Sequence, residues 1–147
     1  MKNTKIIKNK KDAYKKLKKY FNKDSEVFLS LHLDDNNRLV NEKLISIGNL
    51  YGFTFKFSHL FDTCLKCNKD NKGKVIFAHT HTNNVLSPSE SDLETLYVIK
   101  QMGIRYRVNI VDYLIFNDKK IRSYKDDEMW QMRGRMQRES KWFIFLL

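Results

Sequence analysis

Hydrophobic and polar residues follow two different periods in the first third of this chain. Residues 11–21 place tyrosine, leucine and phenylalanine at helical spacing with lysines between them, which predicts an amphipathic helix. Residues 26–33 alternate apolar with polar positions, residues 34–37 are turn-forming Asp and Asn, and residues 38–47 alternate again. This second pattern predicts a β-hairpin that follows the helix.

The rest of the chain predicts further helices and strands in turn. Ser58 can cap a helix over residues 58–69, and the apolar run 75–78 predicts a strand covered on both faces. Ser89 opens another helix that Gly103 is expected to end, and residues 105–116 have the β-branched and aromatic side chains typical of a strand. A short strand near Ile121 and a helix over 126–140 complete the pattern. This order predicts an α/β fold, with a mixed sheet flanked by helices.

The charge of the chain is concentrated at its ends. The formal net charge is +11, from 28 Lys and Arg against 17 Asp and Glu. Residues 1–24 hold ten lysines and two aspartates, whereas residues 25–116 hold ten charges of each sign. Two interpretations stay open: the basic ends bind a polyanion such as nucleic acid, or a solvated, lysine-rich helix keeps the protein soluble.

Composition excludes several classes of protein. With 41% hydrophobic residues the chain can bury a core, so extensive disorder is not expected. The longest wholly apolar run, 142–147, is far shorter than the ~20 residues that span a bilayer, and no apolar signal region follows the basic start. Cys64 and Cys67 are too few for a disulfide framework. We therefore expect a cytoplasmic, single-domain protein, in which the C-x-x-C is either part of a core or half of a metal site.

One short stretch of the chain carries side chains with metal-binding chemistry. His79 and His81 lie two residues apart at the exit of the strand predicted over 75–78, so both imidazoles project from one face. Ser89 and Asp92 lie about one turn apart at the start of the next helix. Two imidazoles and one carboxylate are the protein ligands of many catalytic zinc sites, which leave a fourth position open. Each half also has a plain structural interpretation, as partly buried histidines and as a helix-capping box.

The spacing H-x-H, seven residues, then S-x-x-D resembles the JAMM motif of the JAB/MPN metalloprotease superfamily. Residues 74–118 are similar to the core of its RadC-like branch, with Asp112 where that branch has the Asp of a Leu-Asp-His pattern. Residues 28–50 are similar to the first hairpin of the branch, and His59 coincides with a histidine common there. The resemblance covers roughly residues 25–118. It implies a layered fold of the JAB/MPN kind, similar to that of cytidine deaminases.

The resemblance also implies a role for each residue of the motif. His79, His81 and Asp92 would bind Zn²⁺, which lowers the pKa of a water molecule and polarises the substrate carbonyl. Ser89 would donate a hydrogen bond to the oxyanion of a tetrahedral intermediate. The reaction so implied is hydrolysis of an amide or isopeptide bond.

Family members use a glutamate upstream of the histidines as general base, and Glu42 is the expected counterpart in this chain. Because the spacing from Glu42 to Gly48 is longer than usual, a β-bulge is needed to aim the Glu42 side chain inward. Glu26, at the start of the preceding strand, is the alternative base. A Glu42 that faces water beside Lys43 is the structural interpretation.

Two functions from different classes follow. The leading hypothesis is a zinc-dependent JAMM-type peptidase or isopeptidase of the RadC-like family, with a peptide or a ubiquitin-like conjugate as substrate. The competing hypothesis is a DNA-associated repair or recombination protein whose basic termini bind nucleic acid, acting as a metal-dependent nuclease or as an inactive scaffold. The predicted organisation is a basic N-terminal helix over 1–24, the RadC-like core over 25–118 and a C-terminal extension over 119–147 that packs on the core.

The helix predicted near the C-terminus has two interpretations. Trp130 and the arginines around it are typical of a surface that stacks on bases and binds phosphates. Alternatively, Met129, Met132 and Met136 form the buried stripe of an amphipathic helix that packs against the sheet. We favour the second interpretation.

Overall fold

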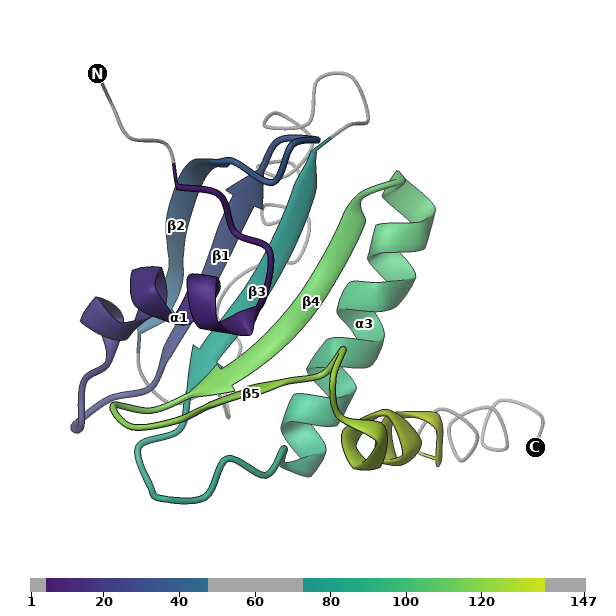
Figure 1. The fold of residues 1–147 in the computed structure, drawn as a ribbon. Coiled ribbons are helices and arrows are strands. Elements are labelled where there is room, and N and C mark those ends of the chain that lie inside the picture. Colours follow the sequence, from purple (N-terminus) through teal and green to yellow (C-terminus); the bar gives the residue numbers. More distant parts are fainter. Residues whose placement is uncertain (1–4, 48–72, 137–147) are drawn as a thin grey trace, which may run out of the picture.

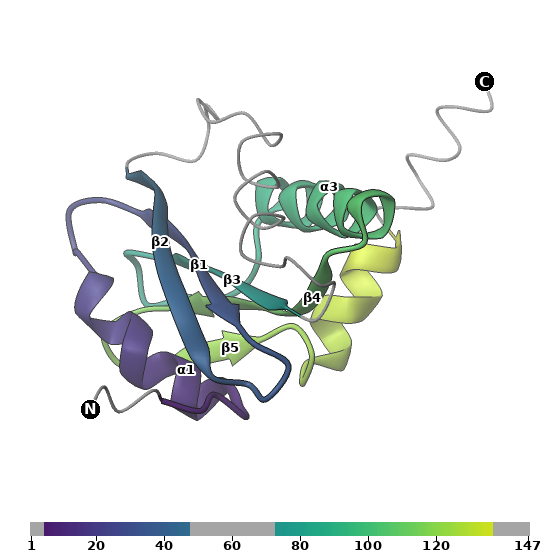
Figure 2. The same cartoon turned by 90° about the horizontal axis from the view of Figure 1, so that it is seen from above.

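The computed structural model describes residues 5–47 and 73–136, whose strands form one five-stranded mixed sheet with helices on both faces (Figures 1 and 2). The elements in chain order are α1 (Lys10–Leu17), the short 3₁₀ helix η1 (Lys18–Tyr20), β1 (Val27–Leu33), β2 (Leu39–Ile47), β3 (Lys74–Thr80), α3 (Glu90–Tyr106), β4 (Asn109–Phe116) and β5 (Ile121–Ser123). Residues 128–136 are also helical and are named the C-terminal helix below. The predicted α/β fold, a mixed sheet flanked by helices, is confirmed.

The strand order of the sheet is β2-β1-β3-β4-β5. β1 pairs antiparallel with both β2 and β3, β3 and β4 are parallel, and β5 pairs antiparallel with β4. A parallel pair needs a long crossover, and α3 supplies it between β3 and β4. α3 lies on one face of the sheet and α1 on the other, as the view from above shows (Figure 2). The predicted hairpin is confirmed as β1 and β2.

Alternation along the strands divides the buried side chains into two cores. The α1 face of the sheet is mostly aliphatic and packs under Ala13 and Leu17 of α1, whereas the α3 face is rich in aromatic side chains. The sheet residues of the α1 face include Leu29, Leu31, Leu33, Ile76, Ala78, Leu114 and Phe116, and those of the α3 face include Phe28, Val75, Phe77, Tyr113 and Ile115. Both faces of the central strands are therefore covered, as the apolar run at 75–78 predicts.

α3 differs from the sequence prediction at its end, because Gly103 does not terminate it. The helix runs on to Tyr106 and is capped by Arg107, whose backbone is left-handed with a φ of 57°. Gly103 instead allows close packing, since a Cβ atom there would lie 2.6 Å from Cδ1 of Ile110. The next strand therefore begins at Asn109 rather than at residue 105.

The side of the C-terminal helix that packs against the sheet is not the side that the sequence predicts. Trp130 is fully buried, while Met129, Met132 and Met136 are 64%, 48% and 63% exposed. The prediction that the methionines form the buried stripe is therefore wrong. A tryptophan offers more apolar area to the core than a methionine, and Trp130 packs edge-on against the rings of Tyr113 and Tyr124.

Several predictions concern parts of the chain outside the described residues. They are the helix over 58–69, His59, Cys64 and Cys67, and the apolar end 142–147. In the ranges 5–47 and 73–136, no helix combines the length and the apolar character that crossing a membrane requires.

Candidate metal centre

Two histidines and one aspartate come together where β3 ends and α3 begins. His79 projects from β3, His81 follows just after this strand, and their ring centroids lie 4.9 Å apart. Asp92 lies in the first turn of α3. One potential ligand atom from each of the three side chains lies within 4.8 Å of the others, and all three residues are buried. The structure thus brings together the three metal ligands that the sequence motif predicts.

His81 is oriented by a hydrogen bond from the ring nitrogen that does not face Asp92. Its Nδ1 lies 3.0 Å from the carbonyl oxygen of Val85, which can only accept, so Nδ1 carries the proton. Its Nε2 lies 3.0 Å from Oδ2 of Asp92. As an imidazolium, His81 donates from Nε2 to this carboxylate; as a neutral imidazole with its proton on Nδ1, it has on Nε2 the free electron pair that a metal ion requires. A carbonyl that fixes the tautomer of a ligating histidine is a common feature of metal sites.

His79 is held differently, by aromatic rings. Its Nε2 lies 3.0 Å from Oδ1 of Asp92, but this contact lacks hydrogen-bond geometry, and among residues 5–47 and 73–136 neither ring nitrogen has a hydrogen-bond partner. The ring packs instead against Phe28 and Tyr113, with centroid distances of 6.3 and 5.5 Å. A fully buried imidazole without a partner is costly, and a metal ion at Nε2 would satisfy it. The donor set and this unpaired nitrogen therefore fit a metal ion.

The charges of His81 and Asp92 are coupled. Burial alone lowers the pKa of His81, but the hydrogen bonds to Asp92 and Val85 and the charge of Glu26 outweigh burial and raise it. Burial alone raises the pKa of Asp92, but the contacts with the two histidines and with the Ser89 N–H hold it well below its usual range. Asp92 is thus ionised at neutral pH, as a carboxylate ligand must be.

Ser89 is the N-cap of α3 and completes a capping box with Asp92. The Ser89 Oγ accepts a hydrogen bond from the Asp92 N–H at 3.1 Å, and the Ser89 N–H donates to Oδ2 of Asp92 at 2.8 Å. The local sequence Ser-x-x-Asp therefore both starts the helix and fixes the carboxylate beside the histidines. The Ser89 hydroxyl still has its own proton to donate, so capping leaves the predicted oxyanion role open.

Glu42 does not lie with the metal triad. It pairs with Leu31 across the β1–β2 ladder, between the two register shifts of the hairpin, and so projects from the α1 face. Its carboxylate accepts hydrogen bonds from Tyr20 Oη at 2.6 Å and from Lys19 Nζ at 3.3 Å. Burial raises the pKa of Glu42, but these two partners lower it further than burial raises it. The register shifts of the hairpin do not turn Glu42 toward the triad, so this geometry does not bring the predicted general base to the two histidines.

Glu26, the alternative base, lies on the side of the triad. β1 pairs with β3 so that Phe28 lies opposite His79, and the same antiparallel register continued by two residues places Glu26 opposite His81. The Val27 N–H donates to Oγ1 of Thr80 at 2.8 Å, which ties the residue next to Glu26 to the segment that carries the histidines. The sequence contains a signal for this placement, because side chains two residues apart in an extended chain point to the same side, as Glu26 and Phe28 do.

Tyr113 is a neighbour of the site that the sequence motif does not reveal. It stands where the resembling pattern has the His of Leu-Asp-His, and it is 1% exposed. Burial, and then the charges of Asp92 and Glu26, raise the pKa of Tyr113 well above its usual value. Its ring lies between His79 and Trp130, with centroid distances of 5.5 and 5.8 Å. The C-terminal helix therefore supports His79 through this ring.

Arg133 of the same helix braces the other half of the site. Its Nη1 donates to the carbonyl oxygen of Pro88 at 2.8 Å, one residue before the N-cap Ser89. The backbone that leads into α3 is thereby attached to the C-terminal helix. Nothing in the local motif predicts this contact, since it joins residues 45 positions apart.

Comparison with known proteins agrees with this geometry. A family model described as the RadC-like JAB domain matches residues 7–129, a range that includes α1, the sheet and the triad. A UPF0758 protein of Aquifex aeolicus is 29% identical over 121 residues, 82% of this chain and 51% of that protein. A UPF0758 protein of Methanosarcina mazei is 28% identical over 122 residues, which are 82% of this chain and 52% of that protein. A UPF0758 protein of Actinobacillus pleuropneumoniae is 31% identical over 107 residues, which are 67% of this chain and 47% of that protein. The chain thus spans about half the length of these curated relatives, and it belongs to the RadC-like JAB domain family.

Proposed function

We propose that this protein is a zinc-dependent hydrolase that cuts an amide or isopeptide bond, with His79, His81 and Asp92 as its metal ligands. The observation that carries the proposal is the buried convergence of two imidazole nitrogens and one carboxylate, within 4.8 Å of one another. When bound, Zn²⁺ would supply a Lewis acid that polarises the substrate carbonyl and lowers the pKa of a water molecule. The bond class comes from the resemblance to the JAB/MPN superfamily.

The ligand set favours zinc over magnesium or calcium. Two of the three donors are imidazole nitrogens, which suit zinc, whereas magnesium and calcium prefer sites made of oxygen atoms. A set of three protein ligands also leaves room for water and substrate, as in catalytic rather than structural zinc sites.

We assign the general-base role to Glu26 rather than Glu42. The register of β1 and β3 supports this assignment, because it places Glu26 opposite His81 on the side of the triad. The Glu26 carboxylate would take a proton from the attacking water and return it to the leaving amine. Ser89 at the N-cap of α3 would donate its hydroxyl proton to the oxygen on which negative charge develops.

Metal content is the first test. Elemental analysis of the metal-replete protein is expected to give about one zinc per chain, because three protein ligands define one site. His79→Ala should lose the zinc, and Glu26→Gln should keep it, since Glu26 is not a ligand. Wild-type protein without zinc would contradict the proposal. Zinc retained by His79→Ala would contradict the assignment of the ligands.

Turnover of a defined probe is the second test. The probe is a peptide ending in Gly-Gly joined through an amide to an aminocoumarin, whose release is fluorescent. Glu26→Gln should lower the rate by about 10²-fold or more, because the proton acceptor is lost. Glu42→Gln is the matched control and should retain the rate, since this carboxylate faces Tyr20 on the other side of the sheet. The opposite pattern would return the role to Glu42.

A further inference from the structure

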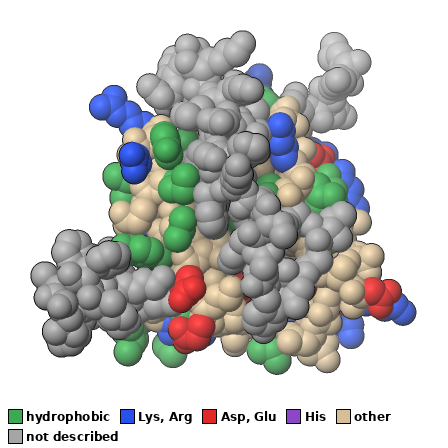
Figure 3. All heavy atoms as spheres, turned by 180° about the vertical axis from the view of Figure 1, so that it is seen from behind, with side chains coloured by type: hydrophobic (Ala, Val, Ile, Leu, Met, Phe, Trp, Pro, Cys, Tyr) green, Lys and Arg blue, Asp and Glu red, His purple; other side chains and the backbone are tan. Residues whose placement is uncertain are grey.

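Positive charge is divided unequally between the two faces of the sheet. Residues 5–24, which include α1, hold nine lysines and two aspartates. Residues 73–106, which run from β3 through α3, hold three basic and three acidic residues. Because α1 and α3 lie on opposite faces, the excess belongs to the α1 side (Figure 2). Seen from behind, on the α3 side, Lys and Arg side chains are scattered rather than gathered (Figure 3).

α1 directs its lysines away from the sheet. Ala13 and Leu17 are buried against the strands, and Lys11, Lys15 and Lys18 recur at i, i+4 and i+7 on the opposite, exposed side. Within the described ranges, none of these three lysines has a carboxylate within ion-pair distance. This differs from Lys19, which pairs with Glu42 at 3.3 Å. The three ammonium groups are therefore available to an anion from outside.

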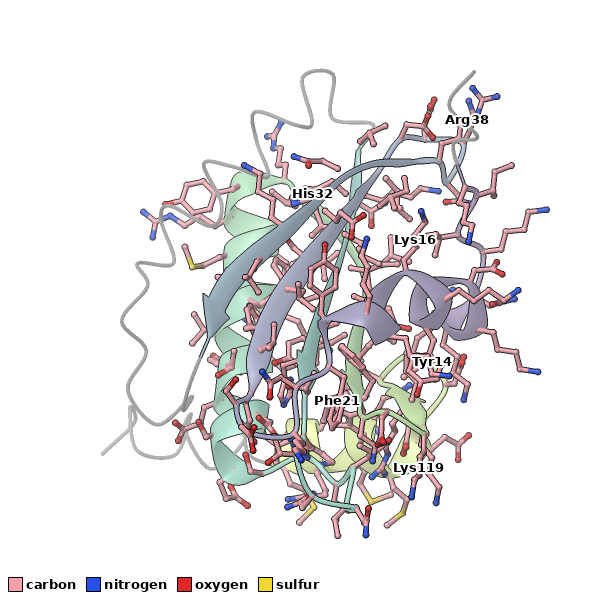
Figure 4. The ribbon with its side chains drawn as sticks, turned by 90° about the vertical axis from the view of Figure 1, so that its left-hand side faces the viewer. Tyr14, Lys16, Phe21, His32, Arg38 and Lys119 are labelled. Atoms are coloured by element: carbon pink, nitrogen blue, oxygen red, sulfur yellow. The ribbon has the colours of Figure 1, made fainter. Side chains whose placement is uncertain are left out.

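Neighbouring turns extend this cationic surface. Lys119 and Lys120 are exposed in the turn between β4 and β5, and Tyr14 of α1 donates a hydrogen bond to the carbonyl oxygen of Asn117 in that turn at 2.7 Å. Arg38 is exposed in the hairpin turn. Figure 4 shows Arg38, Lys16 and Lys119 on the same side of the sheet as α1 and away from α3. Together the exposed cations Lys8, Lys11, Lys15, Lys18, Arg38, Lys119 and Lys120 form what we name the α1 basic face.

We propose that the α1 basic face binds the phosphate backbone of nucleic acid. Lysines spread over a helix and two turns can each neutralise one phosphate, which is the main source of sequence-independent affinity. The outward stripe itself carries no aromatic or apolar side chain to stack on bases or to insert into a membrane. Ala13 and Leu17 face the sheet, and the Tyr14 ring lies under Lys18 and packs edge-on against Phe116. The surface therefore fits a phosphate backbone better than a lipid headgroup layer.

This surface is separate from the candidate metal centre. His79, His81 and Asp92 lie on the α3 face, so nucleic acid bound at α1 does not reach them across the sheet. The proposal is therefore independent of the hydrolase proposal, and it makes nucleic acid a docking partner rather than the substrate of the metal site.

The test is fluorescence anisotropy of the whole chain with a labelled DNA duplex of about 20 base pairs, from ~50 to ~200 mM KCl. The logarithm of the binding constant should fall linearly with the logarithm of the salt concentration. The triple variant K11Q/K15Q/K18Q should bind about tenfold or more weakly at the lowest salt, and its slope should be shallower by about 2.7, because each phosphate contact contributes about 0.9. Its midpoint of urea unfolding should match that of wild type, which shows that the fold is intact.

The matched control removes the same charge from the other side of the molecule. R105Q/R107Q/R135Q changes three exposed arginines of the α3 end and the C-terminal helix, and it should leave the slope unchanged. Absence of duplex binding by wild type at ~50 mM KCl would overturn the proposal. An equal loss in both triple variants would also overturn it, since net charge alone would then account for binding. Binding of phosphatidylserine vesicles in place of the duplex would assign the face to a membrane instead.

Discussion

The two faces of the sheet are built by the same strands and differ in almost every chemical respect. On the α1 face, the core is mostly aliphatic and the helix that covers it exposes lysines. On the α3 face, the aromatic rings of Phe28 and Tyr113 pack against His79, which converges with His81 and Asp92. Within β3 itself, Ala78 packs with the first core, and His79, one residue later, belongs to the second face. The comparison shows that neighbouring residues of a strand point to opposite faces, so a shift of one position decides whether a side chain joins the aliphatic core or the candidate metal centre.

The two glutamates of the hairpin illustrate this rule. Glu42 is on the α1 face, where Tyr20 and Lys19 hold its carboxylate. Glu26 precedes β1 by one residue and shares its side with Phe28, the partner of His79. Both carboxylates belong to the hairpin region, and the strand register places them on opposite sides of the sheet.

The largest expected effects come from deleting one large core side chain on each face. Phe28→Ala should destabilise the protein by about 3–5 kcal/mol and Leu17→Ala by about 2–5 kcal/mol, because each side chain is fully buried. Only Phe28→Ala should also weaken zinc binding, since its ring packs on His79 at a centroid distance of 6.3 Å. Urea unfolding gives the stabilities, and competition with a chromogenic chelator gives the zinc affinity. An equal loss of zinc affinity in Leu17→Ala would show that the faces are not independent.

The sequence predicts the local motif of the candidate site well, but it does not predict the glutamate that lies beside it. His79, His81, Ser89 and Asp92 are predictable because they lie within 14 consecutive positions, and local geometry alone brings them together. Glu26 depends on how β1 pairs with β3, about fifty residues away. A sequence pattern does not fix such a register, so the motif spacing pointed to Glu42, which the structure places on the other face of the sheet.

The same distinction holds for the fold. The hairpin and the start of α3 follow from alternation and from a capping residue, both of which are local. The end of α3 does not, because Gly103 serves the contact with Ile110 rather than termination. The helical period alone could not tell whether Trp130 or the methionines of the C-terminal helix would be buried, since both choices fit that period. Predictions failed where tertiary packing chose between two locally equivalent arrangements.

The next largest effect concerns how the α3 face holds His79. Tyr113→Leu should weaken zinc binding by about 10–100-fold, because it removes the ring that packs edge-on against His79, whose imidazole finds no hydrogen-bond partner in the described part of the chain. Tyr113→Phe keeps the ring and should bind zinc nearly as wild type does. Chelator competition on both variants separates ring packing from the hydroxyl group. If Tyr113→Phe loses as much affinity as Tyr113→Leu, the hydroxyl rather than the ring supports the site.

His32 is expected to make the folding stability depend on pH. Burial, and then the charge of Lys43, lowers the pKa of His32, which is labelled in Figure 4, to about 4. Its Nε2 lies 2.8 Å from Ser30 Oγ. Since the unfolded chain has a histidine pKa near ~6.5, it binds more protons than the folded chain between the two values. Stability should therefore fall by about 2 kcal/mol from pH 7 to pH 5 through this group.

The measurement is urea unfolding of wild type and His32→Gln at the two pH values. Glutamine retains a polar group beside Ser30 but does not titrate, so the difference between the two proteins isolates His32 from the other titrating groups. The variant should lose less stability on acidification than wild type. Parallel losses would show that His32 takes up its proton without disturbing the α3 face.

The smallest expected effects come from removing the N-cap side chain of one helix on each face. Asn9 caps α1 and Ser89 caps α3, each accepting a hydrogen bond from the backbone N–H three residues later, at 2.9 and 3.1 Å. Replacing either with alanine should cost about 1 kcal/mol in urea unfolding, because one backbone donor loses its partner. Only Ser89→Ala should also slow release of aminocoumarin from the Gly-Gly probe, by about 10²-fold, since its hydroxyl faces the reacting carbonyl in the proposed site. Equal turnover by the two variants at equal stability would reduce Ser89 to a cap, and the chemistry of the α3 face would then rest on the triad and Glu26 alone.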